Sequence, residues 1–150
     1  MTLPPTTLER VRHAAGLAAI LDAAYKAFED MLQILRAHED PASGLFLPVM
    51  VAAASAADGR DAIVFAPSLP PWQDSGASVV EDAAQAGKGA QTAGDSAESA
   101  ADAVAGLARL LATRLAQSGE SAADPGDRSA CSDAARCAEE ICRLLRRGEP

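Results

Sequence analysis

The chain of 150 residues has the length of a single domain and can bury a sizeable hydrophobic core. Apolar residues make up 49% of it, but 36 residues are alanine and only 3% are aromatic, so helices can pack closely while each side chain buries little area. The net charge of −8 repels nucleic-acid phosphates and anionic lipids, and we therefore expect neither nucleic acid nor a membrane as a partner.

The location predicted from the sequence is cytoplasmic. The apolar run over 14–21 is short and ends at Asp22, which does not fit a secretory signal. The uncharged run over 45–57 contains Pro48 and is shorter than the roughly 20 residues that a membrane-spanning helix needs. The three cysteines, an odd number, favour free thiols in a reducing compartment.

The longest stretch with helical periodicity covers residues 6–38. Apolar side chains recur along it every three or four residues, so they lie on one side of an α-helix and on an adjacent second row. The two rows include Leu8, Val11, Leu21, Phe28, Leu32 and Leu35, and Ile20, Ala24, Ala27, Met31 and Ile34. Asp22, Lys26 and Asp30 are four residues apart with alternating charge, which supports the helix. We expect one long helix with packing partners on two sides.

Three further helices are predicted, over 45–58, 95–117 and 129–147. Pro48 is tolerated in the first turn of its helix, and Gly59 is placed to end that helix. The run over 62–65 has no second strand-like segment to pair with, so we expect an extended segment that lies on the helices.

The connection over 60–94 is expected to carry a short helix over about 79–86 and an extended, proline-rich strip. No polar linker is long enough to separate domains, so residues 1–150 are interpreted as a single helical domain. The predicted fold class is all-α. We expect an antiparallel bundle of four main helices with a long connection between the second and the third.

Alanine residues form matching rows on two of the predicted helices. These rows are Ala15, Ala19, Ala23 and Ala27 on the first, and Ala100, Ala108, Ala112 and Ala116 on the helix over 95–117. Facing each other, they would bring the helix axes toward the low end of about 8–10 Å, and Gly16 and Gly106 fit such close packing. On this hypothesis, replacing Ala19 or Ala108 by leucine is strongly destabilising.

The segment 68–72, Ser-Leu-Pro-Pro-Trp, is the most distinctive short string in the chain. Two adjacent prolines favour polyproline II geometry, and the only tryptophan follows them. Leu69, Pro70, Pro71 and Trp72 therefore form a candidate docking strip for a protein partner, or a lid over a site. The alternative is that Leu69 and Trp72 only hold a long loop against the core.

Cys131, Cys137 and Cys142 do not predict a metal site or a disulfide. Their spacings of six and five residues differ from the two to four typical of a structural zinc pair, and no histidine is near in sequence. Cys131 and Cys142 share a helical face but lie about 16 Å apart along the axis, too far for a disulfide. We expect the three thiols to pack in the core, and we predict no metal and no cofactor.

The two histidines remain as candidates for chemistry. His13 lies one turn after Glu9, an arrangement that could supply half a metal site or an acid–base pair, and an exposed histidine without such a role is the alternative. His38 lies beside Glu39 and Asp40 at a predicted helix end, where the helix dipole favours a cation.

The string His13-Ala14-Ala15-Gly16 resembles the segment around the reactive histidine of histidine phosphotransfer domains, which are helical bundles with an exposed histidine followed by small residues and a glycine. The lysine usual before the family's glycine is absent, and the glycine comes one residue early. The resemblance covers four residues. It implies an alternative function, a small-ligand-binding or phosphoryl-receiving bundle that uses His13.

No glycine-rich phosphate loop and no Gly-x-Ser-x-Gly elbow are present, and residue types used in catalysis are not clustered. We therefore expect a non-enzymatic protein-interaction or regulatory module, with a protein partner or self-association through the alanine-rich faces. The two functions make different predictions for variants. The first requires residues 68–77, and the second requires His13.

Overall fold

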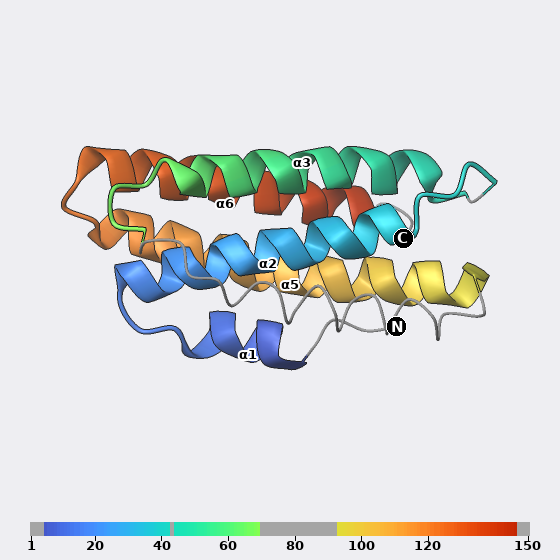
Figure 1. Cartoon of the computed structure of the whole chain (residues 1–150), viewed down its shortest axis with the longest axis horizontal. Helices are drawn as coiled ribbons and strands as arrows, with labels where there is room; N and C mark the ends of the chain where they lie inside the picture. The colour runs from blue at the N-terminus through green and yellow to red at the C-terminus, as the bar shows by residue number, and fades with distance from the viewer. Residues whose placement is uncertain (1–4, 43, 70–92, 147–150) are drawn as a thin grey trace.

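The computed structural model describes residues 5–42, 44–69 and 93–146, and within these ranges the chain is helical and has no strand. Its helices are α1 (Pro5–His13), α2 (Leu17–Ala37), α3 (Phe46–Val64), α5 (Ala93–Ser121) and α6 (Pro125–Leu145) (Figure 1). The all-α prediction is confirmed. The short helix expected over about 79–86 lies outside the described residues.

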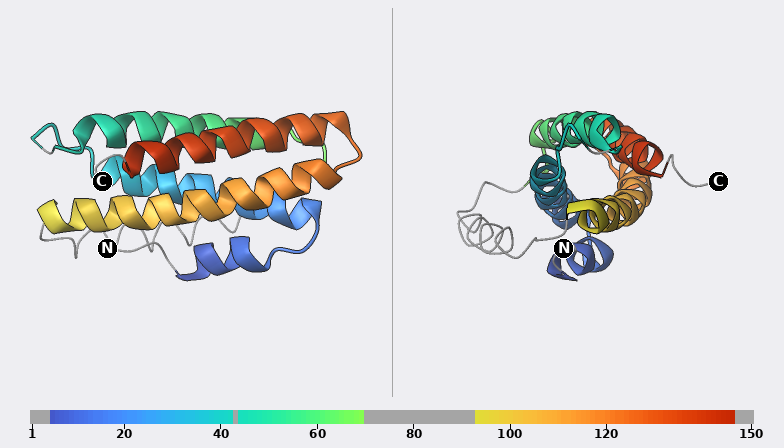
Figure 2. Two further views of the ribbon diagram at one scale, coloured as in Figure 1. Left: turned by 180° about the vertical axis from the view of Figure 1, so that it is seen from behind. Right: turned by 90° about the vertical axis from the view of Figure 1, so that its right-hand side faces the viewer.

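The helices enclose a common hydrophobic core. α5 packs most extensively on α6, α6 also packs on α3, and α3 packs on α2. Seen along their axes, α2, α3, α6 and α5 surround the core, and α1 lies outside them beside α2 and α5 (Figure 2). The largest fully buried side chains are Val11, Leu21, Phe28, Met31, Leu35, Val49, Ile63, Val104, Leu107, Leu111, Leu115 and Ile141.

The single helix expected over 6–38 is divided into α1 and α2. Gly16 precedes α2 with φ 90° and ψ 157°, a backbone conformation that residues with a side chain rarely adopt. The Arg114 guanidinium donates a hydrogen bond to the Ala14 carbonyl and so ties the connection to α5. α1 therefore lies alongside α2 and does not continue it (Figure 1). The apolar repeat did not indicate this break, because it continues on both sides of the glycine.

We expect Gly16→Ala to destabilise the protein by about 1–3 kcal/mol, because the added Cβ strains the backbone at this φ. Space is not the limit, since nothing lies within 4 Å of where that Cβ would be. Urea unfolding measures the effect. Gly44→Ala is the matched control, because Gly44 also has open space but no positive φ, and its stability should barely change. Equal losses in both variants would contradict the assigned backbone strain.

The alanine rows are buried only in part, which corrects the hypothesis that they face each other along their whole length. Ala15 and Ala116 are exposed, and Ala19 is half-buried. Gly106 is exposed too, with open space around its Cβ position, so no close approach explains it. The partner that α5 contacts most is α6, whereas its contact with α2 is smaller. Ala108 is fully buried, so a leucine there is still expected to overpack the core.

α3 continues past Gly59 to Val64, so the predicted helix end and the extended segment over 62–65 are wrong. Ile63 is fully buried, because the continued helix places it on the same side as the buried residues Ala56 and Gly59. Gly59 is buried as well, and a Cβ on it would lie 2.5 Å from two ring carbons of Phe28. The glycine therefore permits close packing of α2 on α3 and does not terminate the helix.

α5 and α6 both extend beyond the facing ends of the helices predicted over 95–117 and 129–147. α5 continues to Ser121, and α6 begins at Pro125. Asp124 caps α6, and its carboxylate accepts a hydrogen bond from the Gly126 amide at 2.7 Å. An aspartate followed by proline is a recognised helix start, so α6 begins at Pro125 and not at the predicted residue 129.

Candidate protein-interaction surface

α3 is apolar on the side that faces away from the core as well as on the side that faces it. Its buried side consists of Val49, Ala52, Ala53, Ala56, Gly59 and Ile63. The large apolar residues that are exposed in the described ranges are Leu47 (64%), Met50 (41%), Val51 (42%), Val64 (49%) and Phe65 (81%), all within α3 or directly after it. A helix that is apolar all round is normally covered all round.

The outer residues of α3 follow the spacing of a helix–helix seam. Leu47, Val51, Ala54, Asp58, Asp61 and Phe65 succeed one another at alternating intervals of four and three residues, and each is exposed. This spacing places side chains on one narrow line along a helix, as in lengthwise helix pairing. We call these six residues the α3 stripe. Its ends are apolar, and its middle carries two carboxylates.

The two carboxylates of the α3 stripe differ in their partners. Arg60 lies between Glu29 of α2 and Asp61, with nitrogen–oxygen distances of 3.5 and 3.3 Å. Asp58 has no ion pair within the described residues. Burial raises the pKa of the Cys137 thiol in α6, and the nearby Asp58 charge raises this pKa further. The middle of the stripe is thus an acidic region that borders α6.

One end of the α3 stripe is anchored to α6. Ser68 donates from its backbone amide to Asp127 Oδ1 at 2.9 Å and from its hydroxyl to Oδ2 at 2.6 Å. Asp127 is 1% exposed, so water competes little for these bonds. Leu69 is half-buried against the core, whereas residues 70–72 of the predicted docking strip lie outside the described residues. The strip stays a prediction.

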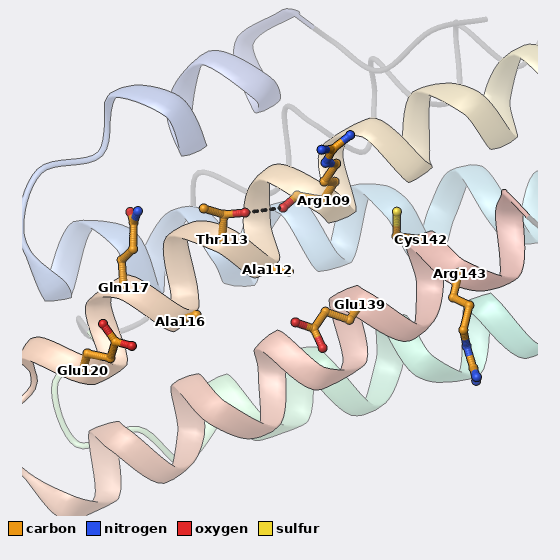
Figure 3. Close-up of a pocket in the computed structure, with 9 residues that line it drawn as sticks. All are labelled: Arg109, Ala112, Thr113, Ala116, Gln117, Glu120, Glu139, Cys142 and Arg143. Carbon is orange, nitrogen blue, oxygen red and sulfur yellow. Dashed lines mark hydrogen bonds between the residues drawn. The ribbon is translucent and has the colours of Figure 1, made fainter.

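A groove of about 530 Å³ lies between α5 and α6 (Figure 3). It is lined by Arg109, Ala112, Thr113, Ala116, Gln117, Glu120, Glu139, Cys142 and Arg143. Its charges are mixed in sign, and every charged side chain on its walls is exposed. Exposed charges hold an ion only weakly, because water competes with them. The groove is therefore a weaker candidate than the α3 stripe.

The three cysteines are free thiols that lie in or against the core, as predicted. Cys131 is fully buried, Cys137 lies near Asp58 of α3, and Cys142 lines the groove between α5 and α6. Burial raises the pKa of the Cys131 thiol, and the Asp127 charge adds to this effect. Cys131 and Cys137 therefore stay protonated at neutral pH.

The structure does not assemble the histidines into a site. His13 is exposed and is the last residue of α1, so the small residues after it belong to the connection to α2. Nδ1 of His38 lies 2.9 Å from the Ile34 carbonyl oxygen in the last turn of α2. No group of three or more His, Cys, Asp or Glu side chains that could hold a metal ion occurs in the described part of the chain. A role for His13 stays a prediction.

A buried polar pair that the helical pattern does not reveal joins α1 to α2. Thr7 Oγ1 donates to Asp30 Oδ2 at 2.5 Å, and the two residues are 2% and 7% exposed. Burial raises the pKa of the Asp30 carboxyl, against smaller lowering effects of the Thr7 bond and the Arg10 charge. Within the row of alternating charges, Lys26 pairs with Asp22 at 3.0 Å as the spacing predicts, whereas Asp30 is buried and bonds to Thr7.

We expect Asp30→Asn to stabilise the protein at neutral pH. The amide oxygen can still accept the Thr7 hydroxyl, and no charge is then buried. In the wild type, the folded state binds the Asp30 proton more tightly than the unfolded chain does, so stability is lost as the pH rises from 3.8 through the raised folded pKa. Urea unfolding at a series of pH values measures both proteins. Their difference should shrink as the pH falls through this range, and a widening difference would contradict the assigned direction.

No helix within the described ranges is both long enough and apolar enough to cross a membrane. Comparison of the chain with protein-family models, with curated proteins and with solved structures gives no match.

Proposed function

We propose that this chain is a non-enzymatic protein-interaction module and that the α3 stripe, with Met50 and Val64 beside it, is its docking surface. The observation that supports this proposal is the group of exposed large apolar side chains on one helix, of which Phe65 is 81% exposed. Scattered apolar side chains are normal on protein surfaces, whereas apolar residues gathered on one face are typical of interaction sites.

We infer that the scaffold is an antiparallel bundle of four main helices, α2, α3, α5 and α6. Short connections after α2 and α5, together with the shared core, support this arrangement. The buried side of α3 fixes its rotation, so that the stripe is presented on a rigid element. The free thiols support a reducing, cytoplasmic location.

Site-specific crosslinking tests whether a partner binds the outer side of α3. A photoreactive amino acid in place of Val51 should crosslink a partner in native lysate, and Leu47→Ser should reduce that product. The matched control places the same amino acid at Asp102, which is exposed on α5 outside both the stripe and the groove. Equal products at both positions would contradict the proposal. So would a strict monomer in light scattering that captures no partner.

The alternative function, ligand binding or phosphoryl transfer through His13, requires a different result. His13→Ala should then abolish ligand or label, while the α3 variants retain it. The docking strip needs its own variant, and deletion of 68–77 is unsuitable because it removes the Ser68 bonds to Asp127. Replacing Pro70, Pro71 and Trp72 by serine leaves those bonds in place.

A further inference from the structure

We infer that the occupant of the α3 stripe is an amphipathic helix of another protein, with two basic residues one turn apart in the middle of its apolar face. This inference rests on the proposed function, because it takes the stripe as the docking surface. It adds the shape and the charge of the partner.

The shape follows from the spacing of the stripe. Residues at alternating intervals of four and three run from Leu47 to Phe65, a length of about 27 Å along the helix. A second helix laid lengthwise places its own side chains between these residues at the same repeat. An amphipathic helix against a helical apolar face is a recurring mode of recognition. It also covers both apolar ends of the stripe at once.

The charge follows from the middle of the stripe. Asp58 and Asp61 lie one turn apart, and a purely apolar partner would bury both carboxylates without new partners, which is costly. Arg60 already contacts Asp61 and Glu29, whereas Asp58 has no ion pair within the described residues. Two lysines or arginines one turn apart on the partner would meet these carboxylates. The net charge of −8 also draws a basic partner toward the chain.

A second copy of this chain fits the stripe poorly. In a parallel pair, Asp58 faces Asp58 of the other copy, and Asp61 faces Asp61. In an antiparallel pair with Leu47 opposite Phe65, the Asp58 carboxylates of the two copies lie about 6 Å apart along the axes near the centre of the contact, and Asp61 faces Val51 of the other copy. A shifted antiparallel pair can overlap the first apolar half of the stripe, but it leaves Phe65, which is 81% exposed, uncovered. Like charges in close contact disfavour the first two arrangements.

Three synthetic peptides test the inference. Each is a helix-forming chain of about 20 residues with the same apolar positions, a length that covers α3. They differ only at two central positions on the apolar face, which hold lysine, glutamine or glutamate. Fluorescence anisotropy measures their binding to the full chain. We expect the lysine peptide to bind roughly tenfold tighter than the glutamine peptide and the glutamate peptide to bind least, with the differences reduced by salt.

Charge reversal on the protein provides the controls. The double variant Asp58→Lys with Asp61→Lys should reverse the order, so that the glutamate peptide binds best. Asp102→Lys makes the same kind of change at an exposed position of α5 and should preserve the original order. Val51→Ser should weaken all three peptides alike, because it removes a contact that they share.

The other outcomes overturn the inference in distinguishable ways. If the three peptides bind equally and Val51→Ser abolishes their binding, the inference of a basic pair is wrong, but the proposed docking surface stands. If no peptide binds but the crosslink at Val51 still forms, the inference is again wrong and the docking surface stands. If neither peptide binding nor the crosslink is observed, the proposed docking surface is wrong as well. A dimer in light scattering that Val51→Ser dissociates identifies a second copy. Peptide binding only after residues 70–92 are replaced by a glycine–serine linker identifies the chain's own segment as the occupant.

Discussion

Gly59→Ala is expected to lower the free energy of unfolding by about 3 kcal/mol, while Gly106→Ala should raise it by about 0.5–1 kcal/mol. Each change adds one methyl group to the interior of a helix, so the gain in helix propensity is the same in both. The two methyl groups meet different surroundings. On Gly59 the Cβ would lie 2.5 Å from two ring carbons of Phe28, and on Gly106 nothing lies within 4 Å.

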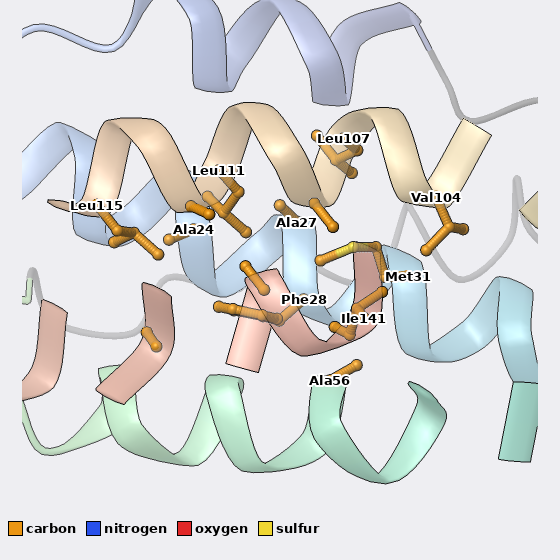
Figure 4. Packing of buried hydrophobic residues seen from close by; sticks show 14 of the residues in the cluster. Ala24, Ala27, Phe28, Met31, Ala56, Val104, Leu107, Leu111, Leu115 and Ile141 are labelled. Carbon is orange, nitrogen blue, oxygen red and sulfur yellow. The ribbon is translucent and has the colours of Figure 1, made fainter. Parts of the chain in front are cut away.

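The Phe28 ring is enclosed by the core at this contact. The side chain is fully buried, and Figure 4 shows it in the core near Ile141 and Ala56. A shift of the ring or of α2 would disturb close-packed neighbours on both sides. The double variant Phe28→Leu with Gly59→Ala should therefore lose less stability than the sum of the single changes. Thermal and urea unfolding of the four proteins measure this coupling, and additive losses would contradict the proposed steric contact.

Asp127→Ala is expected to cost about 3 kcal/mol, because the Asp127 carboxylate accepts two hydrogen bonds from Ser68 in a buried setting. The carboxylate also lies in the first turn of α6, where a negative charge is favourable. Asp127→Asn keeps one acceptor oxygen and should cost roughly half as much. Urea unfolding of the three proteins measures the series.

Asp124→Ala is the matched control, because it removes an aspartate three residues earlier that is exposed and only caps the helix. Loss of such a cap costs about 1 kcal/mol. Asp127→Ala should in addition increase proteolysis near residue 68, since that segment loses its anchor to α6. Equal costs for the two alanine variants would show that the bonds to Ser68 add nothing beyond helix capping.

The helical periodicity of the chain predicted the all-α class and many core residues, including Leu21, Phe28 and Leu35. It could not predict the break at Gly16, because the apolar repeat is the same on both sides of the glycine. Nor could it assign Gly59, whose role depends on the Phe28 ring from another helix. In the sequence, a glycine that ends a helix cannot be distinguished from one that adopts a positive φ or one that makes space for a side chain of another helix. Only the tertiary contacts and the backbone angle distinguish these cases.

The candidate surface was less predictable than the core. α3 carries apolar residues on all sides, so its sequence does not indicate which side faces outward. The packing of α2 and α6 decides this, by covering Val49 and Ile63 and leaving Val51 and Phe65 exposed. His13 and Leu69–Trp72 were recognisable by their residue types. The buried bonds of Asp30 and Asp127 were not, because their partners are 23 and 59 positions away in the sequence.

α1 has a consequence for amide hydrogen exchange. Nine residues are fewer than the roughly 12–15 that an isolated helix needs, so α1 depends on its contacts through Thr7, Leu8 and Val11. A swing about Gly16 breaks these contacts while the core between α2, α3, α5 and α6 stays closed. The amides of α1 should then exchange in a sub-global opening, well before those of α5 and α6. Protonation of Asp30 would slow this early exchange, so that acid protects the N-terminal helix selectively.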